Sequence, residues 1–201
     1  MQRGKTLGSV RTFVHLDAAF TAPAWLEGLR QGHTFFSTGP LLEFRVGGKI
    51  PGGVVRLPAG GGTVVFEGTA RCAGPLTKVM IYHRRGVFRE IPLNAQADGA
   101  RFREEVRVTE SDWFSLAAEG PAYGPFDAAF ALAATNAVRV YAGEQKIRDR
   151  ESAEYFLRWI EILRRETAQW RWWRSQAEKD HIFAQYDEAQ RVYERFIQEA
   201  R

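Results

Sequence analysis

The sequence contains one cysteine, Cys72, and only four histidines, which are widely separated. A single cysteine excludes an intramolecular disulfide and any zinc site built from several thiolates. No two histidines lie two to four residues apart, the spacings typical of local metal sites. We therefore expect no metal site and no bound cofactor in this chain alone. The low cysteine content also fits a reducing compartment such as the cytoplasm.

Motifs that carry chemistry are missing as well. The chain has no Gly-x-Ser-x-Gly nucleophile elbow, no Gly-x-Gly-x-x-Gly loop and no Walker sequence. The glycine run at 60–62 precedes a predicted strand, whereas a phosphate-binding loop needs a helix N-terminus behind it. Glu104 and Glu105 are neighbours on a predicted strand and point to opposite faces, so they cannot act as a carboxylate pair. We predict no catalytic residue here.

Long apolar runs and blocks of one charge are also lacking. No run of 18 apolar residues exists, and the first ten residues lack the apolar core of a signal peptide. Lys and Arg exceed Asp and Glu by four in the whole chain, and this excess lies in 1–143, while 144–201 is balanced. The excess is spread over many positions, whereas nucleic-acid binders concentrate it in a patch. We expect neither a membrane nor a nucleic acid as a partner.

The sequence does contain enough apolar material for a folded core, with 45% hydrophobic residues and 14 Phe. Its first segment, 1–40, predicts a strand over 9–16, a helix over 22–31 and a second strand over 33–36. Thr21 is a suitable N-cap, and proline follows it in the first helical turn. Strand, helix and strand within about 30 residues match the size of one βαβ unit, which needs neighbouring strands to cover its sheet.

The segment 41–143 has a different pattern. Short β-rich runs recur about every ten residues and are separated by glycine-rich turns, which predicts an antiparallel β-sandwich. The run 102–108 alternates apolar and polar residues, with Glu104 as one polar residue on the apolar face. Cys72 lies in such a run and is interpreted as a small buried hydrophobe.

The last segment, 144–201, predicts two helices. Asp149 is a suitable N-cap for the first helix, and Ser175 with Glu178 forms a capping-box pattern for the second. We expect a break near 170–175, where tryptophans alternate with arginines. Such a mixture can stack nucleic-acid bases, but we interpret the tryptophans as pinning the helix junction onto the sandwich.

Several motifs together resemble the PHP-type metallohydrolases of the carbaryl-hydrolase-like (CehA/McbA) group. The resemblance covers nearly the whole chain, and its most specific part is 25–52. That part reads Trp25-Leu-Glu-Gly-Leu-Arg30, then Gly32-His-Thr-Phe-Phe-Ser-Thr-Gly-Pro-Leu-Leu42, then Val46-Gly-Gly-Lys49 with Pro51-Gly52. Weaker echoes are Pro75-Leu76, Trp113, Thr135-Asn-Ala-Val138 and Ala153-Glu-Tyr-Phe-Leu-Arg-Trp-Ile160.

The resemblance implies a mainly β fold with helices. It consists of a βαβ remnant of a barrel over 1–40, an antiparallel β-sandwich over 41–143 and a helical hairpin over 144–201. In the family an N-terminal β/α barrel binds divalent metals, and its last ligand motif, Asp-x-His, precedes the segment that matches 7–12. The metal-ligand motifs are thus expected to be missing from this chain. His33 stands where the family has arginine, which puts a supporting role in substrate binding in doubt.

Barrel active sites lie at the C-terminal ends of parallel strands. In an intact enzyme we would therefore expect an active-site rim at the ends of the two N-terminal strands, formed by His15, Asp17, Ser37 and Thr38. Without a barrel, the apolar face of the βαβ segment would be uncovered at Phe13, Val14, Phe35 or Phe36. The expected partners are thus the missing barrel or a second copy bound through this segment.

The sequence supports three functional hypotheses. The first is a non-catalytic C-terminal region of a PHP-type hydrolase that acts on esters, carbamates or phosphoesters. The second is a free-standing binding module for a glycan or a protein, in which Trp113 or Tyr123 would contact the ligand. The third, nucleic-acid binding through 164–174, has the least support because acidic residues surround the arginines.

Overall fold

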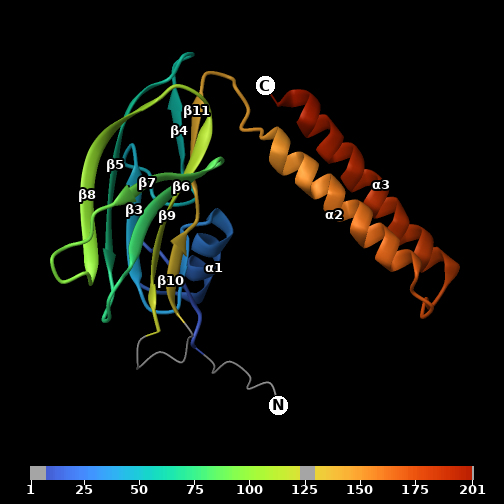
Figure 1. Cartoon of the computed structure of the whole chain (residues 1–201), viewed down its shortest axis with the longest axis horizontal. Helices are drawn as coiled ribbons and strands as arrows, with labels where there is room; N and C mark the ends of the chain where they lie inside the picture. The colour runs from blue at the N-terminus through green and yellow to red at the C-terminus, as the bar shows by residue number, and fades with distance from the viewer. Residues whose placement is uncertain (1–7, 123–129, 201) are drawn as a thin grey trace. The chain divides into compact units, whose positions relative to one another are not determined.

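The structure is a computed structural model that describes residues 8–122 and 130–200. It divides into two compact units, Met1–Gln145 and Lys146–Arg201. The predicted fold class is confirmed, since antiparallel sheets form a sandwich in the first unit and two helices form the second (Figure 1). The predicted segment 1–40 is part of the first unit, because its strands pair with a strand of the sandwich.

Two sheets of unequal width make up the sandwich. The smaller sheet has the strand order β3-β5-β8 and is antiparallel throughout. Its strands are β3 (Leu41–Val46), β5 (Gly62–Arg71) and β8 (Gly99–Val108).

The larger sheet follows the order β1-β2-β10-β9-β11-β4, and β6 with β7 joins it through β9. β10 and β11 are separated by only two residues and pair in succession with the two ends of β9, while β4 pairs with β11 in parallel. The strands are β1 (Arg11–Val14), β2 (Thr34–Ser37), β4 (Val54–Leu57), β6 (Lys78–His83), β7 (Gly86–Ile91), β9 (Asp112–Pro121), β10 (Phe130–Thr135) and β11 (Val138–Ala142).

The N-terminal segment contains the predicted strand, helix and strand, but they do not form a parallel βαβ unit. Helix α1 (Ala22–Gln31) has the predicted bounds, and the Thr21 hydroxyl caps it by accepting from the Ala24 N–H at 3.2 Å. β1 and β2 are antiparallel, and the His15 N–H donates to the His33 carbonyl at 2.8 Å. The chain thus leaves α1 beside the end of β1 and runs back along that strand. The expected parallel pairing is wrong because α1 fills the connection of a β-hairpin.

The core lies between the two sheets and is lined with aromatic and β-branched residues. Phe66 of β5 is fully buried and meets Phe114 of β9 edge to face, with ring centroids 4.8 Å apart. Full burial of one such side chain stabilises the fold by roughly 1.5–3 kcal/mol. Glu104 lies on the inner face of β8, as predicted, where it forms an ion pair with Arg89 of β7.

The second unit is a helical hairpin of α2 (Arg150–Ala168) and α3 (Gln176–Glu199). Asp149 caps α2 by accepting from the Ser152 N–H at 2.7 Å, and Ser175 caps α3 as the capping-box pattern predicted. The two helices meet through aromatic contacts, including Phe156 stacked on Tyr193 at 5.1 Å.

Substitution of Phe66 by Ala tests the position of the core. We expect the free energy of unfolding to fall by about 3–5 kcal/mol, because the change removes buried surface and leaves a cavity. The matched control is Val87→Ala, since Val87 is 52% exposed, and it should change the value little. Chemical denaturation followed by far-ultraviolet circular dichroism measures both, and equal effects would contradict the proposed core.

Glu199 gives the helical unit a dependence on pH. Hydrogen bonds from the Lys146 and Arg148 side chains, at 2.9 and 2.8 Å, lower the pKa of this carboxyl below its ordinary value of 4.5. A carboxyl whose pKa is lowered by folding stabilises the folded state above the ordinary pKa. This contribution disappears as the pH falls through the lowered pKa.

We therefore expect Glu199→Gln to reduce the stability of the helical unit at pH 7 but not well below the lowered pKa. Glu188→Gln on the same helix is the control, because Glu188 is exposed and no ion pair is seen for it among the described residues. Urea unfolding at both pH values measures the difference. A Glu199→Gln effect that is the same at both would contradict this assignment.

Candidate functional site

The candidate site is a groove at the side of the sandwich, which we call the edge groove. The smaller sheet ends at β3, whereas the larger sheet continues past β10 through β2 and β1. The inner faces of β1 and β2 therefore extend beyond the edge of β3. A groove of about 490 Å³ opens there, lined by Phe13, Val14, His15, His33, Thr34, Phe35, Leu41, Leu42, Glu43, Phe44, Arg45, Ile50, Pro51, Thr69, Arg71 and Thr135.

Two cross-strand pairs form the floor of the edge groove. Phe13 and Phe35 lie opposite each other and stack with ring centroids 4.7 Å apart and planes 4° apart. His15 and His33 lie two residues beyond the phenyl pair and opposite each other, with the His15 N–H bonded to the His33 carbonyl. Because side chains alternate between faces every residue, the two histidines share the face of the phenyl pair. The floor thus offers an aromatic surface, and two histidines also line the groove.

Charged side chains line the rim. Glu43 and Arg45 stand on the outer face of β3, and Arg71 on the neighbouring strand β5. The Thr69 hydroxyl donates to the Glu43 carboxylate at 3.1 Å, and Arg45 donates to the Gly48 carbonyl at 3.3 Å. An aromatic floor with a mixed polar rim suits a ligand that has an apolar body and polar ends.

The backbone of β3 adds a further binding feature. The Gly47 N–H donates to the Val65 carbonyl at 2.8 Å, just beyond the last residue of β3. Antiparallel pairs alternate between bonded and non-bonded positions, so the N–H and C=O groups of Leu42 and Phe44 point away from β5. No strand of the described chain pairs with this edge. The edge groove therefore presents backbone donors and acceptors as well as side chains.

The predicted rim residues are not brought together. Ser37 is opposite Arg11, at the other end of the β1–β2 hairpin from His15 and Asp17. The antiparallel pairing is the reason, because the C-terminal ends of the two strands lie at opposite ends of the hairpin. His15 lines the edge groove and lies 3.0 Å from the Asp17 carboxylate, in a pair exposed enough to add little stability.

Ser37 and Thr38 have structural contacts instead. The buried Ser37 hydroxyl donates to the Pro40 carbonyl at 2.5 Å and accepts from the Gly39 N–H at 2.8 Å, which closes the turn into β3. The Thr38 hydroxyl lies 2.9 Å from the carbonyl of Phe130 and accepts from the Leu132 N–H at 2.8 Å. Both hydroxyls hold β2 to its neighbours. A role for either at the rim of an intact enzyme stays a prediction.

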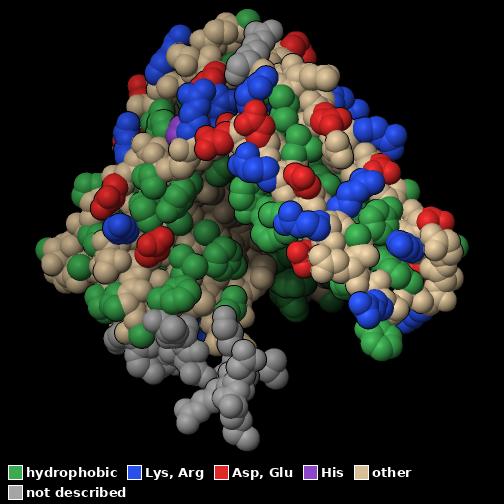
Figure 2. All heavy atoms as spheres, turned by 45° about the vertical axis from the view of Figure 1, so that its right-hand side comes forward, with side chains coloured by type: hydrophobic (Ala, Val, Ile, Leu, Met, Phe, Trp, Pro, Cys, Tyr) green, Lys and Arg blue, Asp and Glu red, His purple; other side chains and the backbone are tan. Residues whose placement is uncertain are grey.

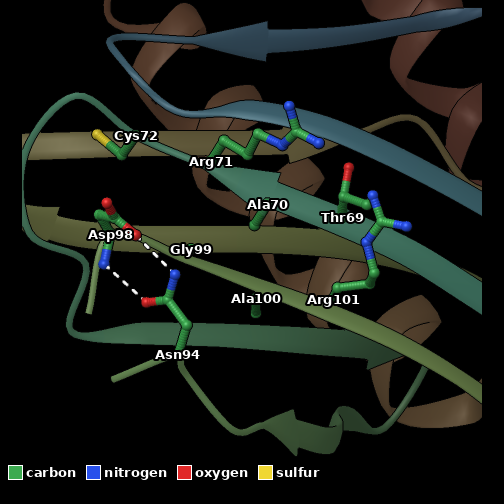
Figure 3. Close-up of a pocket in the computed structure, with 9 residues that line it drawn as sticks. All are labelled: Thr69, Ala70, Arg71, Cys72, Asn94, Asp98, Gly99, Ala100 and Arg101. Carbon is green, nitrogen blue, oxygen red and sulfur yellow. Dashed lines mark hydrogen bonds between the residues drawn. The ribbon is translucent and has the colours of Figure 1, made fainter. Parts of the chain in front are cut away.

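A second hollow of about 410 Å³ lies at the paired ends of β5 and β8 (Figure 3). Figure 3 shows Asn94 and Asp98 turned toward each other, with the Asn94 amide donating to the Asp98 carboxylate at 2.7 Å. These groups close the turn before β8. Cys72 also lines this hollow and is half-buried against the core, less buried than the sequence predicted.

A buried ionic cluster joins two turns and was not predicted from the sequence. Asp112 lies 3.1 Å from the Nδ1 atom of His83 and accepts from the backbone N–H groups of Arg84 and Trp113. The Arg84 guanidinium also pairs with Glu110. His and Asp do form acid–base pairs in enzymes, but none of these residues lines either hollow. The cluster therefore fixes the β6–β7 turn to the β8–β9 turn.

The aromatic residues proposed for ligand binding have different environments. Trp113 is half-buried in β9, and Tyr123 lies outside the described residues. At the junction of the helices, Trp173 is half-buried and packs near Phe183 of α3, with centroids 6.4 Å apart. Trp172 is 91% exposed. Anchoring of this loop on the sandwich stays a prediction.

Comparisons of the chain with protein-family models, curated proteins and solved structures find no match. Within 8–122 and 130–200, no group of three or more His, Cys, Asp and Glu side chains is placed to hold a metal ion. None of the helices in these ranges is long and apolar enough to cross a membrane.

Substitution of Asp112 by Asn tests the ionic cluster. We expect a loss of about 3 kcal/mol in the free energy of unfolding, because the buried Asp112 carboxylate holds the His83 ring and the backbone N–H groups of Arg84 and Trp113. Glu110→Gln should cost less than about 1 kcal/mol, since Glu110 is 40% exposed. Urea denaturation measures both, and an Asp112→Asn variant as stable as the exposed control Glu90→Gln would contradict the assignment.

Proposed function

We propose that this chain is a non-catalytic accessory unit of a PHP-type metal-dependent hydrolase, and that its edge groove contacts the catalytic barrel. The proposal rests on the position of the resembling residues in the fold. The stretch 25–52, which most resembles the CehA/McbA group, comprises most of α1, all of β2 and β3, and the turn after β3. These elements supply most of the residues that line the edge groove.

The packing around this stretch supports the same view. Gly32 and Gly52 both have positive φ values, and a Cβ on Gly52 would lie 2.2 Å from the Gln31 carbonyl. Only glycine permits that approach of the turn to the end of α1. The Gly52 N–H donates to Ala137, and the Asn136 N–H donates to Thr34, each at 2.8 Å. Two separate parts of the resembling sequence, 25–52 and 135–138, thus meet at one junction.

The chemistry of the groove indicates the kind of segment it would contact. The unpaired edge of β3 fits an extended backbone. The phenyl pair fits alternate apolar side chains, while Arg45 and Arg71 fit acidic groups at the rim. In the complete enzyme the barrel's divalent metals would supply a hydroxide nucleophile for an ester, carbamate or phosphoester. This chain would supply contacts that hold the barrel in place.

The test supplies a barrel in trans. A PHP-type hydrolase of this group, trimmed of its own C-terminal region, is mixed with the chain, and binding is measured by titration calorimetry. Leu41→Glu should weaken binding about tenfold or more, because Leu41 lines the groove and is 51% exposed. Val87→Glu is the matched control, with a similar exposed fraction on β7 and no place in the groove.

Three results would contradict the proposal. The first is hydrolysis of esters, carbamates or phosphoesters by the chain alone, with one zinc, manganese or iron ion bound per chain. The second is a trimmed barrel that does not bind the chain at any accessible concentration. The third is a Val87→Glu variant that loses as much affinity as Leu41→Glu, which would show that the contact is not in the edge groove.

The stacked phenyl rings also favour a second candidate, a free-standing binding module. Aromatic surfaces bind sugars and apolar peptide side chains, and a glycan or a protein segment would occupy the same groove. Glycan binding by the chain without a barrel, lost in Leu41→Glu and kept in Val87→Glu, would favour this candidate over the hydrolase accessory.

A further inference from the structure

The helical hairpin has an apolar surface that the two helices leave uncovered. α3 contains no fully buried residue, and α2 contains only Ala153 and Thr167. Five large apolar side chains of α2 are each between 39% and 49% exposed, and we call them the α2 stripe: Tyr155, Phe156, Trp159, Ile162 and Leu163. Figure 2 shows hydrophobic side chains among charged ones on the visible face of this unit.

The α2 stripe follows the helical repeat. Its spacings of three and four residues place its members on one side of the helix, with Trp159 near the centre. This side lies next to the side that faces α3, where Thr167 meets Tyr186 at 2.8 Å. The stripe is therefore a continuation of the hairpin's own apolar interface, as in a helix that packs against more than one neighbour.

The charged residues beside the stripe indicate what covers it. They recur at spacings of four, three and four residues along one flank: Glu154, Arg158, Glu161 and Arg165. Along the helix these charges are negative, positive, negative and positive. In the reverse direction they are positive, negative, positive and negative, so each position meets the opposite sign. An antiparallel second copy therefore places Arg165 opposite Glu154, and it places Glu161 opposite Arg158. In a parallel copy this flank would face the opposite flank of the partner helix, and these four charges would not meet one another.

The same register matches the stripe to itself. When Arg158 opposes Glu161 of the second copy, the exposed part of Phe156 opposes Leu163, while its ring also stacks on Tyr193 of α3. The two Trp159 side chains then lie near the two-fold axis. Arg158, Glu161 and Arg165 make no ion pair with any part of the chain that the structure describes, while Glu154 lies 3.4 Å from Arg150. Three of the four flank charges are thus available to a partner.

The area is sufficient for a stable pair. Aromatic side chains bury about 150–250 Å² each when fully covered, so the half-exposed stripe offers roughly 400 Å² per copy. Two copies and their charged flanks together approach the ~1,000 Å² that a specific interface requires.

We propose that two copies of the chain associate through the α2 stripe, with the two α2 helices antiparallel about a two-fold axis near Trp159. The pair forms a four-helix arrangement in which α3 of each copy packs on the side of its own α2 that adjoins the stripe. This interface is independent of the edge groove, so its failure would leave the proposed hydrolase contact untouched.

Sedimentation velocity of the full chain, from low micromolar concentration upward, tests the proposal. The wild-type chain should show a reversible monomer–dimer equilibrium. Trp159→Arg should weaken the dimer about thirtyfold or more, the loss expected for a central interface tryptophan. Trp172→Arg is the matched control, because Trp172 is 91% exposed outside the stripe, and it should leave the equilibrium unchanged. Circular dichroism checks that every variant keeps its helices.

A charge exchange tests the antiparallel register. Arg158→Glu opposes Glu161 in both halves of the dimer and should weaken it about tenfold. Adding Glu161→Arg to the same chain should restore the wild-type equilibrium. A wild-type chain that is monomeric at all concentrations, a dimer that survives Trp159→Arg, or a double variant without recovery would each overturn the proposal. A monomer would indicate instead that the stripe packs within its own chain or binds a different protein.

Discussion

Two sheets of unequal width share one apolar core, and the rest of the first unit depends on that mismatch. Phe66, Phe114 and their neighbours are buried because β3, β5 and β8 cover the middle of the larger sheet. Water is excluded only where both sheets are present. Beyond β3 the larger sheet continues, and no further strand of the described residues covers it, so the aromatic inner face of β1 and β2 becomes the floor of a groove. The edge groove thus exists because the smaller sheet has fewer strands than the larger one.

The junction between α1 and the turn after β3 gives a physical account of the sequence resemblance. Gly52 approaches the end of α1 too closely for any side chain, and the backbone of 135–138 closes the same junction. These positions constrain backbone geometry and carry no chemistry. A resemblance built on such residues indicates a shared unit of structure. This is why we propose a contact role for the chain and place catalysis in the barrel of the proposed complete enzyme.

Local features could be predicted from the sequence, and non-local ones could not. Thr21, Asp149 and Ser175 marked the helix starts correctly, because caps depend on residues within one turn. The alternation in 102–108 placed Glu104 on the inner face for the same reason. The direction of β2 depends on where α1 packs, and no nearby residue encodes it. The pairing of His83 with Asp112 joins residues that are 29 positions apart in the sequence. The edge of β3 is open because no strand among the described residues pairs with it.

The central claim is that the unpaired edge of β3 is a contact surface. Amide hydrogen exchange at Leu42 and Phe44 tests it most directly, with the chain free and then bound to a trimmed PHP-type barrel. The account predicts that both amides are slowed in the complex, while those of Glu43 and Arg45, already bonded to β5, change little. Unchanged exchange at Leu42 and Phe44 in a complex that does form would contradict the account.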